Sequence, residues 1–413
     1  MALRRAVNPS PRVDVLIVGA GPVGLTLAVA LAGSGLTVAA VDRADPAAPL
    51  EDGRTTAVAA ASQRLYAVTR VWPALARAAC PIHAIRVTDG DAPLFLHFDH
   101  RALAQGPLGW IVDNAALRRS LLRRARGLPG FTLHAPAALA VLERGPARVR
   151  ALLDGGAVIE APVVIAADGR NSRLRREAGI RVTSWRYRQT AIACIAAHER
   201  PHRNIAHERF YAGGPFAILP MLDDARGGHR SSIVWTENAS LAAALLTLPK
   251  AEFDAELAER FGDFLGDVEL VGGRYAHPLG LLHAEHYAAH RLALAGDAAH
   301  AIHPVAGQGF NLGVRDAAAL AEVLVEAHRL GLDLGQATVL ADYARWRRFD
   351  ALALAAMTDS LVRLFGARAA PIRLARHLGL AAVERLPGLK RFFMRQAMGM
   401  VGVRPRLLRG EAL

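Results

Sequence analysis

Cysteine is scarce in this sequence: Cys80 and Cys194 are the only two in 413 residues. Two cysteines cannot build a disulfide framework or a cysteine-based metal site, and this usage is typical of a reducing cytoplasm. Histidine does not compensate, because His300 and His303 share one loop but no third ligand follows at metal-binding spacing. We expect no bound metal and interpret both histidines as structural residues of that loop.

Lysine is almost absent as well, with only Lys250 and Lys390, and the remaining basic residues are arginines. Together with the abundance of alanine, this indicates a compositional habit of the source rather than a functional choice. The formal net charge is nevertheless +13. No nucleic-acid-binding motif accompanies it, so nucleic acid is not an expected partner. An anionic membrane surface or an acidic partner fits the charge better.

An unbroken membrane-spanning segment is also lacking. The run from Val13 to Val41 follows three arginines and contains a single acid, Asp14, so hydropathy alone would suggest a signal peptide or a span. However, Gly19, Gly21 and Gly24 interrupt the run after the length of one strand. That pattern is typical of a strand, a turn and a helix, and we therefore expect a cytoplasmic protein.

The same run carries the first motif. Residues 13–18 predict a buried parallel strand, the sequence GAGPVG gives GxGxxG before a helix, and a second apolar strand ends in Asp42. This is the dinucleotide-binding fingerprint in its required context, in which glycines admit the pyrophosphate and the acid holds ribose hydroxyls. By itself it does not separate FAD from NAD. The candidate contacts are Gly19, Gly21, Pro22, Gly24, Asp42 and Arg43.

Residues 292–316, LALAGDAAHAIHPVAGQGFNLGVRD, have the same order of strand, loop and helix. A short apolar strand ends at Gly296, and a helix is expected from Phe310 to His328. The free N–H groups and the dipole of that helix make its N-terminus an anion-binding corner. Taken alone, this segment could also be a purely structural turn in which Asp297 caps the helix.

The order of residues in this segment resembles the ribityl-binding motif of the para-hydroxybenzoate hydroxylase superfamily, the class A flavin monooxygenases. Within it, HPVAGQGFNLGVRD is most similar to the ubiquinone-biosynthesis FAD-dependent hydroxylases. The resemblance implies FAD, with Asp297 accepting hydrogen bonds from the ribityl hydroxyls and the loop from Pro304 to Phe310 lining the flavin ring. The implied contacts are Gly296, Asp297, Pro304, Gly307, Gly309, Phe310 and Asn311, and the ring-facing loop is Pro304, Val305, Gly307 and Gln308.

A third motif, DGRNSRLR, fits the DGxxSxxR pattern of this superfamily, which lies near the FAD pyrophosphate and the transient nicotinamide site. Asp168 follows a buried strand, and Arg175 is expected to reach phosphate from a short helix. Two further arginines are assigned to FAD by the resemblance. They are Arg54, in residues 51–66 that we expect to form a helix after a Gly-Arg turn, and Arg118, on an amphipathic helix over 113–126. Each could also be a solvated surface arginine.

Residues 181–280 change to strand composition bounded by Gly, Pro and Asp, which predicts an antiparallel sheet inserted before the third FAD segment. PFAILPM and SSIVWTE resemble the ubiquinone hydroxylases, in which this sheet covers the flavin and forms the substrate pocket. The implied wall residues are Phe216, Leu219, Pro220 and Trp235, although such residues could also be plain sheet core.

Residues 338–413 are helical by pattern. Eleven basic residues lie between Arg363 and Arg409, interleaved with Phe392, Phe393 and Met394. A basic amphipathic tail of this kind can lie on an anionic membrane. It could also pack on its own domain or dock a partner protein.

The sequence therefore predicts an α/β protein with a Rossmann-like FAD-binding domain of the para-hydroxybenzoate hydroxylase fold, an inserted antiparallel β-sheet substrate domain and a helical C-terminus. We expect the FAD-binding domain to take residues 1–75, 105–180 and 281–345. The substrate domain should take 76–104 and 181–280, and the C-terminal helical region 346–413.

The resemblance implies a monooxygenase that uses NAD(P)H and O2, through a flavin hydroperoxide, to hydroxylate a polyprenylated phenol in ubiquinone biosynthesis. No second Rossmann fingerprint is visible, so NAD(P)H is expected to dock transiently. The protein could be peripheral to the inner membrane or part of a ubiquinone-biosynthesis complex. The alternatives are a hydroxylase of a soluble aromatic acid or secondary metabolite, and an FAD-bound, non-oxygenating scaffold subunit. The flavin carries the chemistry, and the sequence identifies no catalytic acid–base pair, so the catalytic residues stay unassigned.

Overall fold

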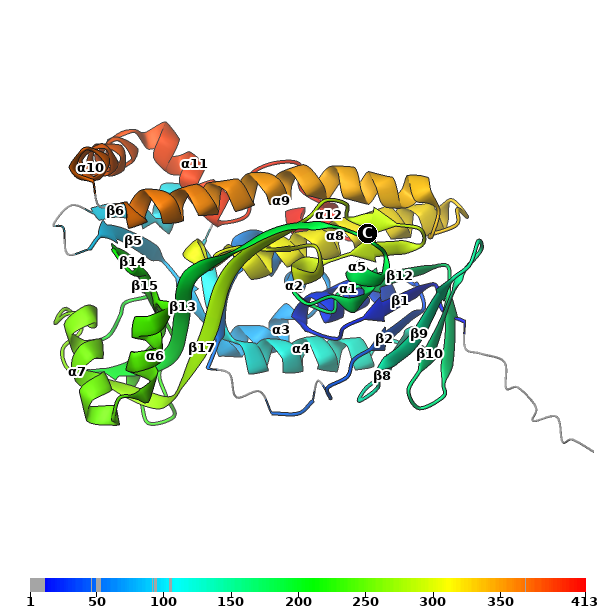
Figure 1. The fold of residues 1–413 in the computed structure, drawn as a ribbon, viewed down its shortest axis with the longest axis horizontal. Helices are drawn as coiled ribbons and strands as arrows, with labels where there is room; N and C mark the ends of the chain where they lie inside the picture. The colour runs from blue at the N-terminus through cyan, green and yellow to red at the C-terminus, as the bar shows by residue number, and fades with distance from the viewer. Residues whose placement is uncertain are drawn as a thin grey trace, which may run out of the picture.

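The computed structural model describes residues 12–45, 47–49, 53–90, 92, 95–103, 106–367 and 369–413. The first eleven residues of the expected FAD-binding domain and Arg368 of the tail lie outside these ranges. The molecule is elongated, with a parallel sheet toward one end, a large antiparallel sheet toward the other, and the long helix α9 (Ala337–Gly366) running across both (Figure 1).

The parallel sheet has the strand order β18-β19-β12-β1-β2-β8. Its strands are apolar on both faces, because α1 (Pro22–Gly33), α4 (Asn114–Arg126) and α8 (Gln308–Arg329) pack around it. Strands β1, β2 and β12 are aligned in parallel as predicted. The strands are β1 (Val15–Val18), β2 (Val38–Val41), β8 (Phe131–His134), β12 (Val163–Ala166), β18 (Ala288–Ala289) and β19 (Leu292–Leu294).

Two small antiparallel sheets flank this core. One consists of β9 (Leu139–Arg144), β10 (Val149–Leu153) and β11 (Val158–Ala161), and it is followed by β12 and the short helix α5 (Arg173–Glu177). The other has the order β3-β7-β4, with α2 and α3 adjoining it. Its elements are β3 (Thr55–Ala59), α2 (Ala60–Val68), α3 (Trp72–Leu75), β4 (Ala79–Ile82) and β7 (Gly109–Asp113).

Strand β3 corrects the expectation that residues 51–66 form one helix. Thr55 to Ala59 pair with Asp113 to Gly109 of β7, and the helix starts only at Ala60. The β-branched residues at the start of this segment favour a strand once a partner strand is present, and the partner lies some fifty residues later in the chain. Residues 51 and 52 lie outside the described ranges.

The predicted antiparallel sheet is present and has eight strands in the order β20-β17-β13-β16-β15-β14-β5-β6, in which only β14 and β5 run parallel. Two helices that the sequence did not predict, α6 (Ala239–Thr247) and α7 (Lys250–Phe261), cover one face. The strands are β5 (Ala84–Asp89), β6 (Phe95–Asp99), β13 (Val182–His198), β14 (Ile205–Tyr211), β15 (Gly214–Pro220), β16 (His229–Asn238), β17 (Val268–Ala284) and β20 (His300–Ala301).

The two faces of this sheet have different neighbours. On the face that we call the outer face, Ile233 packs against Phe253 and Leu257 of α7. The opposite face, which we call the inner face, meets the FAD-binding part, since Thr55 of β3 donates a hydrogen bond to Ser232 at 2.8 Å. This face also carries Leu219, which packs in an apolar cluster with Met394 and Met398 of the C-terminal region.

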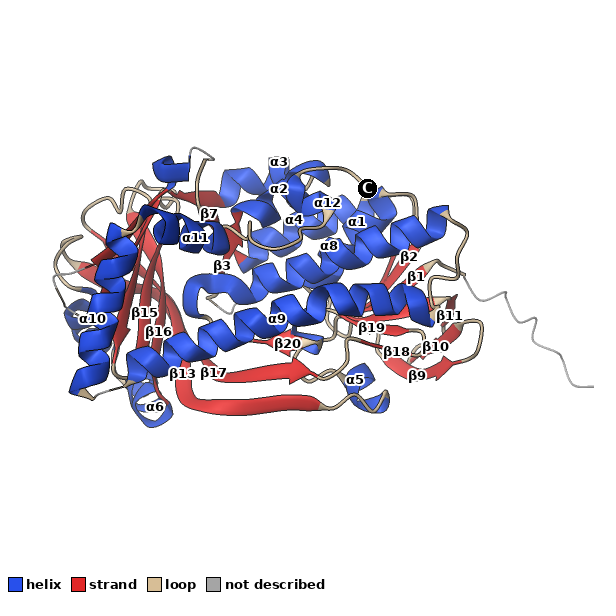
Figure 2. Ribbon diagram, turned by 90° about the horizontal axis from the view of Figure 1, so that it is seen from above, coloured by secondary structure: helices blue, strands red, loops and turns tan. Residues whose placement is uncertain are grey.

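The C-terminal helices fold back onto the rest of the chain. Helices α8 and α9 lie side by side, and α10 (Ala370–Arg385) and α11 (Pro387–Ala397) lie at the large-sheet end (Figure 2). Helix α12 (Arg406–Arg409) returns to α2, where Leu407 and Leu408 are buried. Among the residues described, no helix has both the length and the apolar composition needed to cross a bilayer. The predicted fold class is confirmed, whereas the domain boundaries remain predictions.

Candidate flavin and substrate site

The glycine loop after β1 shows three different reasons for glycine. Gly19 has φ +106°, and a Cβ there would overlap the carbonyl of Ala167. A Cβ on Gly24 would overlap the carbonyl oxygen of Gly19, because α1 crosses β1 closely at this point. Nothing lies within 4 Å of the Cβ position of Gly21. Gly21 therefore faces open space at the N-terminus of α1, where the N–H groups can receive a phosphate.

Asp42 stands at the end of β2 beside this loop. Its Oδ2 accepts a hydrogen bond from the Ala20 N–H at 2.6 Å, and its Oδ1 accepts one from the Ala44 N–H at 2.9 Å. The carboxylate is only half-buried, and the neighbouring Arg43 is exposed. The structure thus brings the acid of the fingerprint to the glycine loop, in a position to accept further hydrogen bonds from ribose hydroxyls.

The corner after β19 touches the first motif directly. Gly296 has φ +60°, and a Cβ there would lie 3.2 Å from Cγ1 of Val23 in α1. Asp297 is exposed although the residues on both sides of it in the chain are buried. The fold therefore presents one carboxylate to the space beside α1, as expected of a residue that accepts hydrogen bonds from a cofactor.

The N-terminus of α8 closes the same space. Gly307 caps the helix with φ +61°, and a Cβ there would lie 2.9 Å from Cβ of Ala57 in β3. The preceding residues Pro304 and Val305 form the predicted ring-facing loop, and Gly309 and Phe310 are half-buried on the first turn of the helix. The free N–H groups of this turn provide positive potential for a negatively charged cofactor edge.

Gln308 and Asn311, the remaining predicted residues of this turn, serve protein contacts. The Gln308 amide donates to the Ala397 carbonyl at 3.1 Å. Asn311 accepts hydrogen bonds from the Ala59 N–H at 2.9 Å and the Ser62 hydroxyl at 2.8 Å. Its amide nitrogen donates to the carbonyls of Ala57 and Gly307. The side chain of Asn311 therefore serves as a clamp between β3 and α8, and its assignment to the cofactor remains a prediction that only its backbone N–H, in the first turn of α8, could fulfil.

The third motif behaves differently at its two ends. Asp168 Oδ2 accepts from the N–H of Arg173, the first residue of α5, at 2.9 Å, whereas Oδ1 is buried and has no hydrogen-bond partner among the described residues. Arg175 does not reach outward to phosphate as expected. It is 5% exposed and donates to the carbonyls of Ala298 at 2.8 Å and Arg170 at 2.9 Å. Arg175 therefore joins the third motif to the Asp297 corner.

The two arginines assigned by resemblance lie on neighbouring segments. Arg54 is exposed just before β3, and its carbonyl accepts from the Asn114 N–H at 3.2 Å. Arg118 is half-buried on α4 and donates to the Ala48 carbonyl, in the segment that follows Asp42. Arg118 thus fixes the chain beside the fingerprint acid. Their contact with the cofactor remains a prediction.

A buried ionic cluster beneath the turn of Gly296 and Asp297 was not predicted from the sequence. Asp316 Oδ2 accepts from the Gly296 N–H at 3.0 Å and lies 2.5 Å from Nε2 of His300, while Oδ1 accepts from Arg347 Nε at 2.9 Å. Burial alone would raise the pKa of Asp316, but His300 and Arg347 outweigh burial and hold the pKa below its usual value. The cluster fixes the Gly296 peptide. The only sign of it in the sequence is Asp316, the acid that ends the GVRD stretch.

His303 supports the ring-facing loop from within. The residue is fully buried, its Nδ1 accepts from the Val305 N–H at 3.3 Å, and its ring meets Tyr187 edge-on at 5.2 Å between centroids. Burial lowers the pKa of His303 to about 4, so the ring is neutral at ordinary pH. No group of three or more potential metal ligands occurs among the residues that the structure describes.

The predicted substrate-wall residues divide between the two faces of the large sheet. Phe216 and Trp235 are 0% and 1% exposed, their ring centroids lie 5.7 Å apart, and Trp235 meets Phe253 of α7 at 5.8 Å. They belong to the outer-face core, so we withdraw them as wall residues. By strand alternation Pro220 also lies on the outer face, whereas Leu219 is on the inner face. The sequence shows that successive residues of these strands alternate between two faces, but it does not show which face meets the FAD-binding part.

The residues on this side fit FAD. The open space at Gly21, the exposed carboxylate of Asp297, the unpaired Oδ1 of Asp168 and the N-termini of α1 and α8 surround one region of the FAD-binding part. Carboxylates can accept from the hydroxyls of ribose and ribityl, and helix N-termini can receive the pyrophosphate and the anionic edge of the ring.

Comparison with known proteins agrees with this geometry. The family model described as FAD binding domain matches residues 12–353. The ubiquinone hydroxylase UbiL of Rhodospirillum rubrum is 51% identical over 406 residues, covering 97% of this chain and 93% of that protein. The 3-demethoxyubiquinol 3-hydroxylase of Escherichia coli is 36% identical over 393 residues, covering 94% and 98%.

Among solved structures, p-nitrophenol 4-monooxygenase PnpA of Pseudomonas putida superposes with a TM-score of 0.79 at 20% identity, covering 95% of this chain and all of that one, which shows the shared fold. The predicted family and the predicted FAD cofactor are confirmed. The chain therefore belongs to the family of FAD-dependent monooxygenases that includes the ubiquinone-biosynthesis hydroxylases.

Proposed function

We propose that this protein hydroxylates the aromatic ring of a polyprenylated phenol in ubiquinone biosynthesis, using NAD(P)H and O2. One observation carries the proposal: 51% identity to a ubiquinone hydroxylase extends over 97% of the chain, including the inner face and the C-terminal helices. The bound FAD supplies electron transfer from NAD(P)H and the activation of O2. The protein supplies binding, orientation, exclusion of water and electrostatic stabilisation.

Each part of the site has a distinct task in this proposal. Asp42 and Asp297 accept hydrogen bonds from the cofactor hydroxyls, and the loop from Gly19 to Gly24 receives the pyrophosphate at the start of α1. The N-terminus of α8 stabilises negative charge that develops at the ring, because its N–H groups are already oriented and need no reorganisation. The buried Asp316 cluster keeps the Gly296 peptide in place for this purpose.

The inner face supports a substrate with an apolar tail. Leu219 and Met221 pack there with Met394, Met398 and Phe393 of the C-terminal region. An aliphatic prenyl chain gains about 0.8 kcal/mol for each methylene that leaves water, so such a surface favours a prenylated phenol over a hydrophilic aromatic acid. The protein must then meet its substrate at a membrane, where the tail resides.

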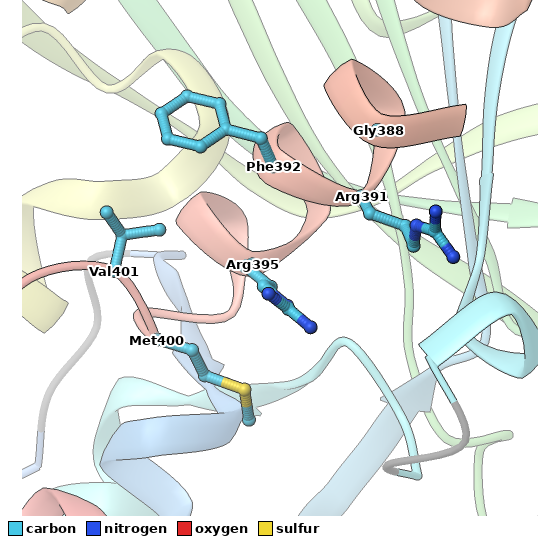
Figure 3. A pocket seen from close by; sticks show the side chains of 6 residues that line it. All are labelled: Gly388, Arg391, Phe392, Arg395, Met400 and Val401. Carbon is cyan, nitrogen blue, oxygen red and sulfur yellow. The ribbon is translucent and has the colours of Figure 1, made fainter. Parts of the chain in front are cut away.

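The C-terminal helices offer a surface for that meeting. Beside α11 there is an open cavity of about 530 Å3 that combines guanidinium and apolar groups (Figure 3). Arg391 and Arg395 can attract anionic headgroups. Met400 connects the cavity to the inner-face cluster, because it packs against that cluster as well. The lining residues are Gly388, Arg391, Phe392, Arg395, Met400 and Val401.

The structure narrows the tail residues that can touch a membrane. Phe392 is 49% exposed, but Met394 is fully buried and Phe393 packs against the inner-face cluster, so only the first of the three can insert. Leu374 and Leu378 of α10 are 61% and 62% exposed and extend the apolar surface. Several tail cations are already paired with carboxylates, through Arg363–Asp359, Arg376–Asp89, Lys390–Glu384 and Arg409–Glu411. Arg391 and Arg395, which form no ion pair with the residues that the structure describes, therefore carry the electrostatic attraction in this proposal.

The deciding experiment compares two substrates with the FAD-loaded enzyme. NADH and NADPH are supplied separately with 2-geranylphenol, which carries a short prenyl tail, or with 4-hydroxybenzoate, and both NAD(P)H oxidation and hydroxylated product are measured. We expect faster, well-coupled turnover of the prenylated phenol. Equal or better turnover of 4-hydroxybenzoate would favour a soluble-acid hydroxylase. The absence of product and of stimulated NAD(P)H oxidation with either compound would favour a scaffold subunit.

A further inference from the structure

Glu208 lies in the middle of β14 and carries a carboxyl group on the inner face. In the sheet register it is opposite Val87 of β5 on one side and Ala217 of β15 on the other. Its neighbours along the same face, Ala206 and Phe210, are 4% and 5% exposed, whereas Glu208 keeps part of its surface accessible. A carboxyl group is thus embedded in an otherwise apolar stretch of sheet.

This stretch of the inner face lies next to the ring-facing loop. Phe210 packs in one cluster with Val305 of that loop and Phe365 of α9, and the rings of Phe210 and Phe365 stack at 3.8 Å between centroids. Val87, directly opposite Glu208, contacts both this cluster and the Met394 cluster. Glu208 therefore lies between the loop expected at the flavin ring and the apolar surface expected to hold the substrate.

The strand neighbours of Glu208 cannot neutralise it. His207 and Arg209 point to the outer face, where the His207 ring lies 4.6 Å from the Phe264 ring and the Arg209 guanidinium lies 5.1 Å from it. Among the residues that the structure describes, no hydrogen bond or ion pair reaches the Glu208 carboxyl group. Burial raises the pKa of Glu208 to about 7.

Other charged groups on the surrounding elements have their own partners. Asp89 of β5 accepts from Arg376 Nε and from His377 Nε2 of α10, each at 2.7 Å. Asp359 of α9 accepts from the Tyr187 hydroxyl at 2.8 Å and pairs with Arg363 at 2.7 Å, and His303 in the loop is neutral. A half-buried carboxyl group without such a partner is unfavourable for the fold, and groups of this kind cluster at functional sites.

We propose that Glu208 is a catalytic residue that binds the phenolic hydroxyl of the substrate and takes up its proton. The carboxylate accepts the O–H hydrogen bond, the proton passes to the carboxylate, and the electron pair of the O–H bond stays on the phenolic oxygen. The ring carbons ortho and para to that oxygen then become more electron-rich, which favours attack on an electrophilic oxygen. The proton returns to solvent after product release. This inference rests on the proposed function, because it requires a phenol.

Glu208→Gln tests the proposal, since glutamine keeps the shape but cannot take up the proton. With FAD-loaded enzyme and 2-geranylphenol, we expect hydroxylation at neutral pH to fall by about 100-fold or more, with a smaller change in KM. The decline of the wild-type rate toward low pH, through an apparent pKa near 7, should disappear, and Glu208→Asp should restore part of the rate. A second readout is independent of turnover. The ultraviolet difference spectrum of the bound probe should show, in the wild type, the red shift of a phenol that donates its O–H to a carboxylate, and Glu208→Gln should lose most of that shift.

Glu237→Gln is the matched control, because Glu237 lies on the outer face of the neighbouring strand β16 and pairs with Arg260 at 3.3 Å. We expect its hydroxylation rate, pH profile and binding spectrum to match those of the wild type. The proposal is overturned if Glu208→Gln keeps the wild-type spectrum, or if its rate falls without any change in the pH profile. Failure of the wild type to hydroxylate the probe would count against the proposed function, and the binding spectrum would still decide the role of Glu208.

Discussion

Replacing Gly24 by alanine should destabilise the folded chain, whereas the same replacement at Gly21 should not. The added Cβ at position 24 would overlap the carbonyl oxygen of Gly19 and lie 3.1 Å from its carbonyl carbon, and both atoms belong to backbone that cannot rotate away. Overpacking of this kind costs about 1–3 kcal/mol, and rigid backbone places Gly24→Ala near 3 kcal/mol. At Gly21 the space around the Cβ position is open and φ is −68°, which alanine adopts readily. Its stability should match the wild type or exceed it by up to about 1 kcal/mol.

FAD binding should distinguish the variants differently, because Gly21→Ala, which does not destabilise the fold, should lower the affinity for FAD. The methyl group of Gly21→Ala occupies the space that we assign to the pyrophosphate, so FAD affinity should fall at least tenfold, or about 1.4 kcal/mol. Urea unfolding of the apoprotein measures the first effect, and titration of apoprotein with FAD, followed by quenching of flavin fluorescence, measures the second. If Gly24→Ala unfolds at the wild-type urea concentration, the close crossing of α1 over β1 is wrong. If Gly21→Ala binds FAD as tightly as the wild type, the pyrophosphate lies elsewhere.

Three further outcomes follow from single features of the structure. Asp297→Asn should purify with little FAD, because the ribityl hydroxyls lose a charged acceptor worth about 1.5–3 kcal/mol, and a full yellow flavin spectrum would refute that role. The pKa of His303 is about 4 in the fold and near 6.5 in the unfolded chain, which therefore binds more protons between these values. Unfolding free energy should fall by up to about 3 kcal/mol as pH drops from 6.5 to below 4, and His303→Gln should lose this part of the pH dependence; equal pH dependence in both proteins would contradict the argument. The double variant Leu374→Ser, Leu378→Ser should co-sediment less with anionic liposomes than the wild type. The control is Leu330→Ser, because Leu330 is 74% exposed but lies outside the tail, and its binding should not change. Point substitutions are preferable to removing residues 386–413, because that segment contains buried core residues such as Met394 and Leu408. Equal binding by the wild type and both variants would exclude the tail as a membrane surface.

Much of the cofactor side could be predicted because its determinants are local. A strand, a glycine turn and a helix N-terminus are specified by residues within about twenty positions, and steric limits on glycine leave few alternatives. Gly19, Gly24, Gly296 and Asp297 accordingly lie where their motifs indicated. The antiparallel sheet predicted over residues 181–280 and the helical C-terminus also follow from local composition, since strand and helix periods differ.

What the sequence alone did not decide depends on contacts between distant segments. Thr55 to Ala59 form a strand only because β7 pairs with them, and Asn311 serves as a clamp because β3 lies against α8. Asp316, His300 and Arg347 meet beneath Gly296 although Arg347 comes from a different helix. Their ionic contacts require the packing of α8 on α9, which no local pattern records.

The faces of the large sheet give the clearest case. Alternation in β14, β15 and β16 was visible in the sequence, and it separates Phe216 and Trp235 from Leu219 and Glu208. A period of two assigns residues to two sets but does not say which set faces the cofactor. Tertiary packing distinguishes the two faces. Helices α6 and α7 cover the outer face, whereas β3, the ring-facing loop and the C-terminal helices contact the inner face. The sequence by itself determined the two sets of side chains, and tertiary packing determined that the set containing Glu208 faces β3, the loop of Val305 and the C-terminal helices.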